Sequence, residues 1–76
     1  MSKKISIIGK NIKKYRAKME ISQDKLSKLA GITLHTITKI ESGTTADPRI
    51  KTLSKIAKAL NVSVDDLIKW IYERKN

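Results

Sequence analysis

The sequence contains no cysteine, so it can form neither a disulfide framework nor a metal site built on thiolates. Its apolar runs are far shorter than the roughly 20 residues needed to cross a bilayer. The apolar stretch at residues 5–8 is too short and too interrupted for a signal peptide. These absences exclude a disulfide-stapled secreted domain and a membrane span, and they favour a cytoplasmic protein.

The usual residues of catalysis are also scarce. The single histidine is His35, no histidine or carboxylate pair stands at metal-ligand spacing, and no glycine-rich phosphate loop is present. Asp65 and Asp66 are better interpreted as favourable charges at the start of a helix than as an acid–base pair. We therefore predict a protein that is not an enzyme and that holds no cofactor or metal.

Positive charge, by contrast, is abundant. The 76 residues include 17 Lys and Arg against 7 Asp and Glu, which gives a formal charge of +10 and a pI near 10.1. Such a charge indicates a polyanionic partner, either nucleic acid or an anionic lipid surface. Because the lysines are spread over several segments instead of lining one amphipathic helix, nucleic acid is favoured over a membrane.

The stretch 21–43 predicts two short helices joined by a tight corner. Ser22 and Thr33 are each placed to cap a helix N-terminus with a hydroxyl group. Gly31, between the two helices, can adopt the left-handed backbone that ends the first helix and turns the chain sharply. A helix, a glycine corner and a second helix form a helix-turn-helix.

The two predicted helices differ in their outer faces. Helical spacing directs Leu26, Leu29 and Ala30 of the first helix and Ile37 and Ile40 of the second toward a core. The opposite side of the second helix is polar and carries a positive charge; its residues are His35, Thr38, Lys39 and Ser42. Any surface helix has a polar side, but this one follows a sharp corner in a basic chain, which favours insertion into a DNA major groove.

Helical periodicity continues on both sides of this stretch. A first helix is predicted over 9–19, a fourth after Pro48 with Asp47 as its N-cap, and a fifth after Asn61 with Ser63 as its cap. Their apolar stripes are Ile8, Ile12, Tyr15 and Met19, then Ile50, Leu53, Ile56, Ala57 and Leu60, then Val64, Leu67, Ile68 and Ile71. We predict one all-α domain over 1–76, with a core over about 8–70 and flexible ends at 1–6 and 73–76.

Trp70 and Tyr72 lie off the apolar stripe of the fifth predicted helix. A helix that is apolar on more than one side generally has more than one neighbour. That second neighbour could be another copy of the chain, or Trp70 could cover the domain's own core beside the first helix. Periodicity leaves both interpretations open.

An ordered set of landmarks resembles the phage repressor and Cro-like helix-turn-helix family of transcriptional regulators. These landmarks are Gln23, Leu26, Ala30 before Gly31, Ile37, Ile40 and Glu41-Ser42-Gly43, followed by P-R-I-K-T-L-S-K-I-A-K-A-L-N-V-S-V-D-D-L. The resemblance covers about Ile8 to Trp70 and implies a compact bundle of five short helices, a lambda-repressor-like DNA-binding domain with its motif at the second and third helices. Ser27 departs from the alanine usual there, and Leu34 stands where many members have a polar base reader.

The resemblance also implies roles for individual residues. The candidate base readers are Leu34, His35, Thr38 and Lys39, and the candidate phosphate contacts are Gln23, Thr33, Thr36, Ser42, Thr44 and Arg49. Arg16 is expected to pair with Glu41. The function implied is sequence-specific binding of an operator in double-stranded DNA, with repression of transcription, by insertion of the helix 33–42 into the major groove.

One short helix reads few base pairs, so we expect a two-fold dimer on inverted half-sites. The candidate dimer residues are Leu67, Trp70, Ile71 and Tyr72. The same fold could instead serve as an antitoxin or adaptor whose main partner is another protein, with DNA binding secondary. The apolar segment 67–72 is the feature that supports this alternative.

Overall fold

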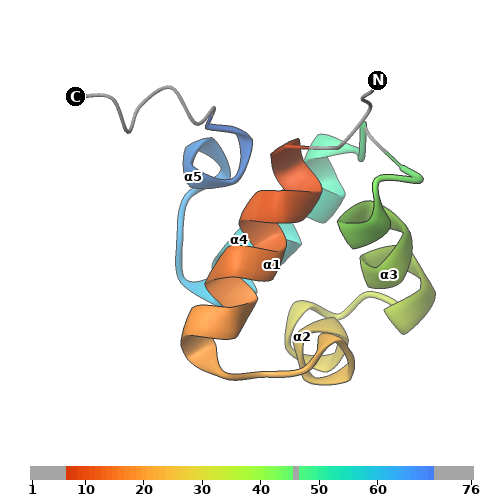
Figure 1. Ribbon diagram of the computed structural model, residues 1–76, viewed down its shortest axis with the longest axis vertical. Coiled ribbons are helices and arrows are strands. Elements are labelled where there is room, and N and C mark those ends of the chain that lie inside the picture. Colours follow the sequence, from red (N-terminus) through yellow and green to blue (C-terminus); the bar gives the residue numbers. More distant parts are fainter. Residues whose placement is uncertain (1–6, 46, 70–76) are drawn as a thin grey trace.

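The computed structural model describes residues 7–45 and 47–69, and all regular structure within them is helical (Figure 1). The helices are α1 (Ile7–Met19), α2 (Gln23–Ala30), α3 (Leu34–Ser42), α4 (Ile50–Leu60) and α5 (Val64–Ile68). The predicted all-α bundle of five short helices is therefore confirmed. The ends predicted to be flexible, 1–6 and 73–76, lie outside the described residues.

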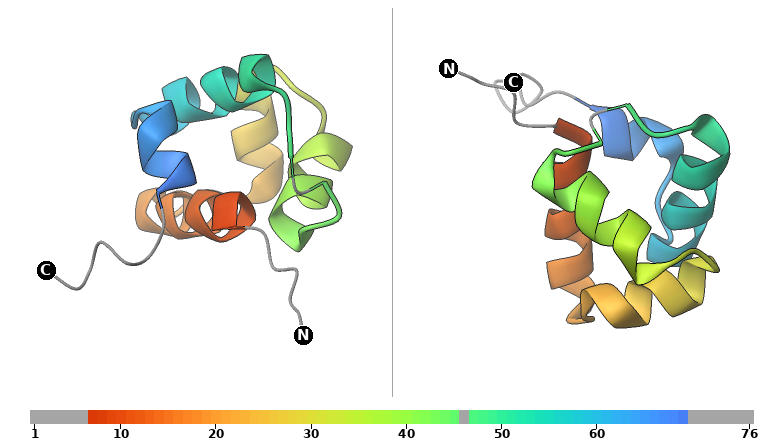
Figure 2. Two further views of the ribbon diagram at one scale, coloured as in Figure 1. Left: turned by 90° about the horizontal axis from the view of Figure 1, so that it is seen from above. Right: turned by 90° about the vertical axis from the view of Figure 1, so that its right-hand side faces the viewer.

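The five helices enclose one core. Helix α1 contacts α3, α4 and α5, while α2 contacts α3 and α4. Figure 2 shows α1 and α4 on opposite sides of the molecule, with α2 and α5 between them at the two ends. Helix α3 and helix α5 lie on opposite sides of α1 (Figure 1). This arrangement separates the outer surface of α3 from that of α5.

Every helix contributes a fully buried side chain to the core. These side chains are Ile12 of α1, Leu26 of α2, Ile37 and Ile40 of α3, Ile56 of α4 and Leu67 of α5. Each had been assigned to an apolar face from its spacing alone. Full burial of such side chains stabilises a fold by about 1.5–3 kcal/mol each, so these positions hold the two motif helices in place.

Four residues predicted to face the core are exposed instead. The exposed fractions are 41% for Met19, 50% for Leu29, 65% for Ile50 and 48% for Ile68. Met19 and Ile68 are the last residues of their helices, Ile50 is the first of α4, and Leu29 is the penultimate residue of α2. Position at a helix end does not by itself expose a residue, since Ala30 and Leu60, the last residues of α2 and α4, are buried; at the four exposed positions no neighbouring helix of the described chain covers the side chain.

The helix ends follow the predicted capping pattern around the motif. Ser22 accepts a hydrogen bond from the backbone N–H of Lys25, and Thr33 accepts one from that of Thr36. Gly31, with φ of 72°, has the left-handed backbone that closes α2. Together these caps fix the corner between α2 and α3.

The start of α4 differs from its prediction. Asp47 is not the N-cap, because Arg49 holds that position with an extended backbone and makes no side-chain capping hydrogen bond. Pro48 therefore precedes the helix instead of occupying its first turn. Because Arg49 has an extended ψ of 149°, the first helical residue is Ile50. The Arg49 side chain is exposed at the end of the loop that follows α3.

Helix α5 is short but capped at both ends. Ser63 accepts from the backbone N–H of Asp66, and the Asp66 carboxylate accepts from the backbone N–H of Ser63, a reciprocal capping box. At the other end, the Asn11 amide of α1 donates to the carbonyl oxygens of Leu67 (2.7 Å) and Lys69 (3.0 Å). The predicted apolar stripe to Ile71 is thus too long: α5 ends at Ile68, and Ile71 lies outside the described residues.

The capping box predicts an acid-dependent loss of stability. The backbone hydrogen bond from Ser63 lowers the pKa of Asp66 below its usual value near 3.8. Because the folded pKa lies below the unfolded one, this contribution is fully present above about pH 5 and is lost as the pH falls through the folded pKa. Urea unfolding should therefore show Asp66→Asn as less stable than the parent near neutral pH, with the difference shrinking in acid; a pH-independent difference would contradict this.

Gly9 brings the backbones of α1 and α3 together. It is buried, and a Cβ atom at this position would stand 3.0 Å from the carbonyl oxygen of Glu41 and closer still to that of Ile40. Separations below 3.0 Å are essentially never observed for real Cβ atoms. The absence of a side chain therefore sets how closely α1 can approach the C-terminal end of α3.

Candidate nucleic-acid interface

Helix α3 presents one buried side and one exposed side. Ile37 and Ile40 are buried, with exposed fractions of 0% and 1%, while the four candidate base readers Leu34, His35, Thr38 and Lys39 are all exposed. The exposed side is therefore a short polar surface with one lysine, one histidine and one leucine. Figure 1 shows α3 at the edge of the molecule, where nothing in the described chain covers its outer surface.

The hydroxyl group of Thr38 already has a donor role within the helix. Its Oγ1 donates to the carbonyl oxygen of Leu34 at 2.8 Å. A hydroxyl group has one proton and two lone pairs, so in this rotamer Thr38 can only accept a hydrogen bond from an outside group. The structure thereby restricts a residue whose bonding role the sequence left open.

Hydroxyl groups form hydrogen-bonded pairs at the two ends of α3. The Thr33 and Thr36 side-chain oxygens lie 2.9 Å apart at the N-terminus, and those of Ser42 and Thr44 lie 2.9 Å apart at the C-terminus. Thr33 also accepts from the backbone N–H of Thr36, and Ser42 donates to the carbonyl oxygen of Lys39. All four are candidate phosphate contacts, and the structure places them in two ordered pairs on either side of the candidate base readers.

The predicted partners Arg16 and Glu41 form a bidentate ion pair. Arg16 Nε lies 2.7 Å from Glu41 Oε2, and Nη2 lies 3.0 Å from Oε1. The third nitrogen, Nη1, donates to the carbonyl oxygen of Ile21 at 2.9 Å. This arrangement joins the end of α1, the α1–α2 turn and the end of α3, so it fixes the position of α3 in the bundle.

Burial makes this ion pair a structural element instead of a surface contact. The Glu41 side chain is 2% exposed and the Arg16 side chain 18% exposed. The hydrogen bond to Glu41 raises the pKa of Arg16 above its ordinary value, although burial acts in the opposite direction. The guanidinium group is therefore charged at neutral pH.

Gln23, a candidate phosphate contact at the start of α2, is attached to this ion pair. Its Nε2 donates to Glu41 Oε1 at 2.9 Å, and the residue is half-buried. One of its two amide protons is therefore committed inside the protein, and a phosphate contact would use the other. No local pattern indicates this hydrogen bond, because Gln23 and Glu41 are far apart in the chain.

The candidate dimer residues fall into two groups. Leu67 is fully buried in the chain's own core, so the prediction that it contacts a second copy is wrong. Its helical neighbour Ile68, predicted to face inward, is instead 48% exposed on the outside of α5. Trp70, Ile71 and Tyr72 lie outside the described residues.

Two kinds of feature are absent from residues 7–45 and 47–69. In these ranges, no three His, Cys, Asp or Glu side chains are grouped so that they could hold a metal ion. Among the same residues, none of the helices has the length and apolar character needed to span a bilayer.

Comparison with known proteins supplies independent evidence. Residues 12–67 match the helix-turn-helix family. The chain is 40% identical over 62 residues to an HTH-type transcriptional regulator of Methanocaldococcus jannaschii, an overlap of 82% of this chain and 89% of that protein. It superposes on the N-terminal DNA binding domain of SinR from Bacillus subtilis with a TM-score of 0.81 and 33% identity, covering 84% of this chain and 93% of that one. The SinR protein in its complex with the SinI protein gives a TM-score of 0.82 at 33% identity, over 88% of this chain and 65% of that one.

Proposed function

Since the chain belongs to the helix-turn-helix family of transcriptional regulators, we propose that it binds a specific operator by inserting α3 into the major groove of DNA. The observation that carries this proposal is the exposed side of α3, held outward by buried Ile37 and Ile40 on its other side. The major groove admits one α-helix and presents a distinct pattern of hydrogen-bonding groups for each base pair.

Each exposed residue of α3 has a chemical role in this proposal. Lys39 donates hydrogen bonds to the O6 or N7 atom of guanine. Thr38, whose proton is directed to Leu34, accepts from the exocyclic amino group of adenine or cytosine. Leu34, 42% exposed, contacts a thymine methyl group, and His35 donates or accepts according to its tautomer.

Contacts to phosphate groups position the reading helix. We assign Gln23 at the start of α2, the exposed Arg49 before α4 and the hydroxyl groups at the two ends of α3 to phosphate oxygens. Phosphate oxygens only accept hydrogen bonds, so the Thr33–Thr36 pair can donate the one proton that its internal hydrogen bond leaves free, whereas Ser42 and Thr44, whose protons are directed to Lys39 and to Ser42, must rotate outward to donate. The formal charge of +10 adds a long-range attraction to the duplex. Such contacts set the register of a protein on DNA without reading its sequence.

The roles of Lys39 and Arg49 can be separated by substitution. We expect Lys39→Ala to reduce discrimination at one or two base pairs by about 1–3 kcal/mol, whereas Arg49→Ala should weaken specific and random duplexes alike. Lys58→Ala is the matched control, because Lys58 is exposed in the last turn of α4, and that end of α4 lies away from α3 (Figure 2). Binding titrations on an operator selected from random oligonucleotides and on random DNA measure both effects. Identical behaviour of Lys39→Ala and Arg49→Ala on the two duplexes would refute these assignments.

A two-fold dimer is the second part of the proposal. One short helix reads few base pairs, whereas two copies can read inverted half-sites about 34 Å apart, one turn of DNA. The pairing surface that we propose is the outer face of α5, where Ile68 is exposed, continued by the segment that holds Ile71 and Tyr72. A dimer on the operator would repress transcription by excluding other proteins from the same base pairs.

The oligomeric state is directly measurable. Sedimentation of the protein with and without its operator should show two chains per site, and Ile68→Ser should weaken pairing while the fold is retained. A single chain at every concentration up to those needed for binding, with and without DNA, would contradict the dimer.

A protein partner is the second candidate function. It is favoured by one observation, that the 33% identical SinR protein forms a complex with the SinI protein. In this case the chain would act as an antitoxin or adaptor, with DNA binding secondary. Titration against random duplex DNA and against promoter DNA at two salt concentrations separates the two functions, because operator binding predicts a steep salt dependence and a preference for the promoter.

A further inference from the structure

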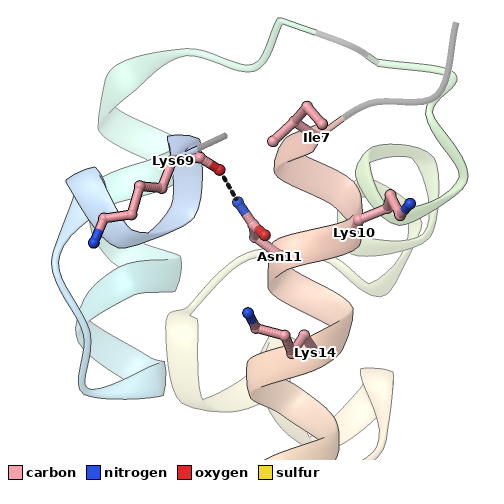
Figure 3. A pocket seen from close by; sticks show the side chains of 5 residues that line it. All are labelled: Ile7, Lys10, Asn11, Lys14 and Lys69. Carbon is pink, nitrogen blue, oxygen red and sulfur yellow. Dashed lines mark hydrogen bonds between the residues drawn. The ribbon is translucent and has the colours of Figure 1, made fainter. Parts of the chain in front are cut away.

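A hollow of about 300 Å³ lies between α1 and the end of α5 (Figure 3). It is lined by Ile7, Lys10, Asn11, Lys14 and Lys69, and most of its wall is apolar. Lysine side chains have aliphatic stems and a charged end that stays in water, so the apolar wall consists of Ile7 and these stems. Lys10 and Lys69 direct their ammonium groups away from the space between α1 and α5 (Figure 3), and Lys69 Nζ lies 3.7 Å from the Asp66 carboxylate. The side chains of Asn11 and Lys14 point from α1 toward α5 (Figure 3).

The chain leaves α5 at the edge of this hollow. Lys69 has an extended backbone, with φ of −65° and ψ of 137°, and its carbonyl oxygen accepts a hydrogen bond from the Asn11 amide at 3.0 Å. That carbonyl oxygen belongs to the planar peptide group that leads to the next residue, whose Cα atom lies about 3.8 Å from that of Lys69. Asn11 therefore anchors the start of the following segment on α1.

We propose that Trp70 of the same chain occupies this hollow and fastens the end of α5 to α1. An indole ring has a large apolar surface and one N–H group, which suits a site with an apolar wall and a wet rim. Lys14, whose ammonium group lies over the Tyr15 ring at 5.4 Å from its centroid, lines the site with its aliphatic stem. A volume of about 300 Å³ is at the lower limit for ligand pockets and accommodates one ring system.

The short connection favours the chain's own tryptophan over that of a second copy. A group joined to its site by a short linker has an effective concentration on the order of millimolar. Trp70 directly follows Lys69, a residue of the hollow itself, so a second copy at lower concentration competes poorly. With Trp70 in the hollow, Ile68, Ile71 and Tyr72 remain for the pairing surface. The proposed position of Trp70 does not depend on DNA binding.

Fluorescence can test the proposal without DNA, because Trp70 is the only tryptophan in the chain. We expect emission at shorter wavelength than that of a solvent-exposed indole, and weak quenching by acrylamide, both independent of protein concentration. Ile7→Ser removes the apolar wall and should shift the emission to longer wavelength and make quenching several-fold stronger. Ile7 is half-buried and is not among the hydrophobic residues packed against the core, so circular dichroism should show the helices retained.

Ile50→Ser is the matched control, because Ile50 is 65% exposed at the start of α4 and does not line the hollow. Its emission and quenching should equal those of the parent chain. Three results would overturn the proposal: emission of an exposed indole in the parent chain, a spectrum that changes with protein concentration as a second copy supplies the site, or equal responses to Ile7→Ser and Ile50→Ser.

Discussion

Replacing Arg16 with methionine is expected to lower the free energy of unfolding by about 3–5 kcal/mol, the usual cost of removing one partner from a buried ion pair. Methionine keeps most of the apolar stem, so the loss comes from the charge. The Glu41 carboxylate, only 2% exposed, would keep a single side-chain hydrogen bond, from Gln23. The carbonyl oxygen of Ile21 would also lose its donor. Urea denaturation near neutral pH measures the change.

The double variant Arg16→Met, Glu41→Leu is the control for this prediction. A buried ion pair replaced on both sides by apolar groups of similar size is often neutral or stabilising, so the double variant should regain most of the lost stability. Glu41→Leu also frees the Gln23 amide, which can reach water at the start of α2. A double variant as unstable as Arg16→Met would show that the cost lies in packing and not in the unpaired carboxylate.

Substitution of Gly9 by alanine is expected to cost about 3 kcal/mol, the upper end of the usual penalty for overpacking a core. The direction of the stability change is informative, because the same glycine-to-alanine change in the middle of an unhindered helix stabilises the protein by roughly 0.5–1 kcal/mol. The added Cβ would meet the backbone carbonyl oxygens of Ile40 and Glu41, which cannot move aside as the end of a side chain could. Either the bundle loses stability or α3 moves away from α1. Thermal unfolding combined with operator titration detects both.

Gly31 offers a contrasting position for the same substitution. A Cβ atom there would have no atom within 4 Å, but its φ of 72° is in the left-handed region. Gly31→Ala should therefore cost about 1–2 kcal/mol from backbone strain, and Gly31→Asn should cost less, since asparagine tolerates this conformation. At Gly9 asparagine should be worse than alanine because it is larger. If the alanine and asparagine variants ranked in the same order of stability at Gly9 as at Gly31, the steric explanation for Gly9 would be contradicted.

Local rules account for most of what the sequence predicted correctly. The caps Ser22 and Thr33 and the left-handed Gly31 depend on residues within a few positions, so the motif could be located with its boundaries. The candidate base readers are all exposed because helical spacing separates them from Ile37 and Ile40. Contact between these residues and DNA depends on how the protein docks on the duplex. Neither the sequence nor the fold determines that docking, so the contacts remain a proposal.

The errors arose where a helix ends or where distant residues meet. Periodicity assigns a side to Ile50 and Ile68 but not the point at which the neighbouring helix stops, so both were wrongly predicted to be buried. Leu67 is buried, as its place on the apolar stripe predicted, and is therefore not at the pairing surface to which it was also assigned. The close approach at Gly9 and the Asn11 contacts with the end of α5 involve residues about 30 and 56 positions apart. A single sequence contains no pattern that links such residues.

The hydroxyl pairs at the ends of α3 have a thermodynamic consequence for complex formation. Thr33 with Thr36, and Ser42 with Thr44, already restrict each other's rotation in the free protein. In the Thr33–Thr36 pair one hydroxyl proton is still free for a phosphate oxygen, so little rotamer entropy remains to be lost there on binding, whereas Ser42 and Thr44 must first rotate. Removing one member of a pair should allow the other side chain to rotate freely, so a single substitution would weaken two phosphate contacts. Calorimetry would measure the lost affinity as a less favourable binding entropy.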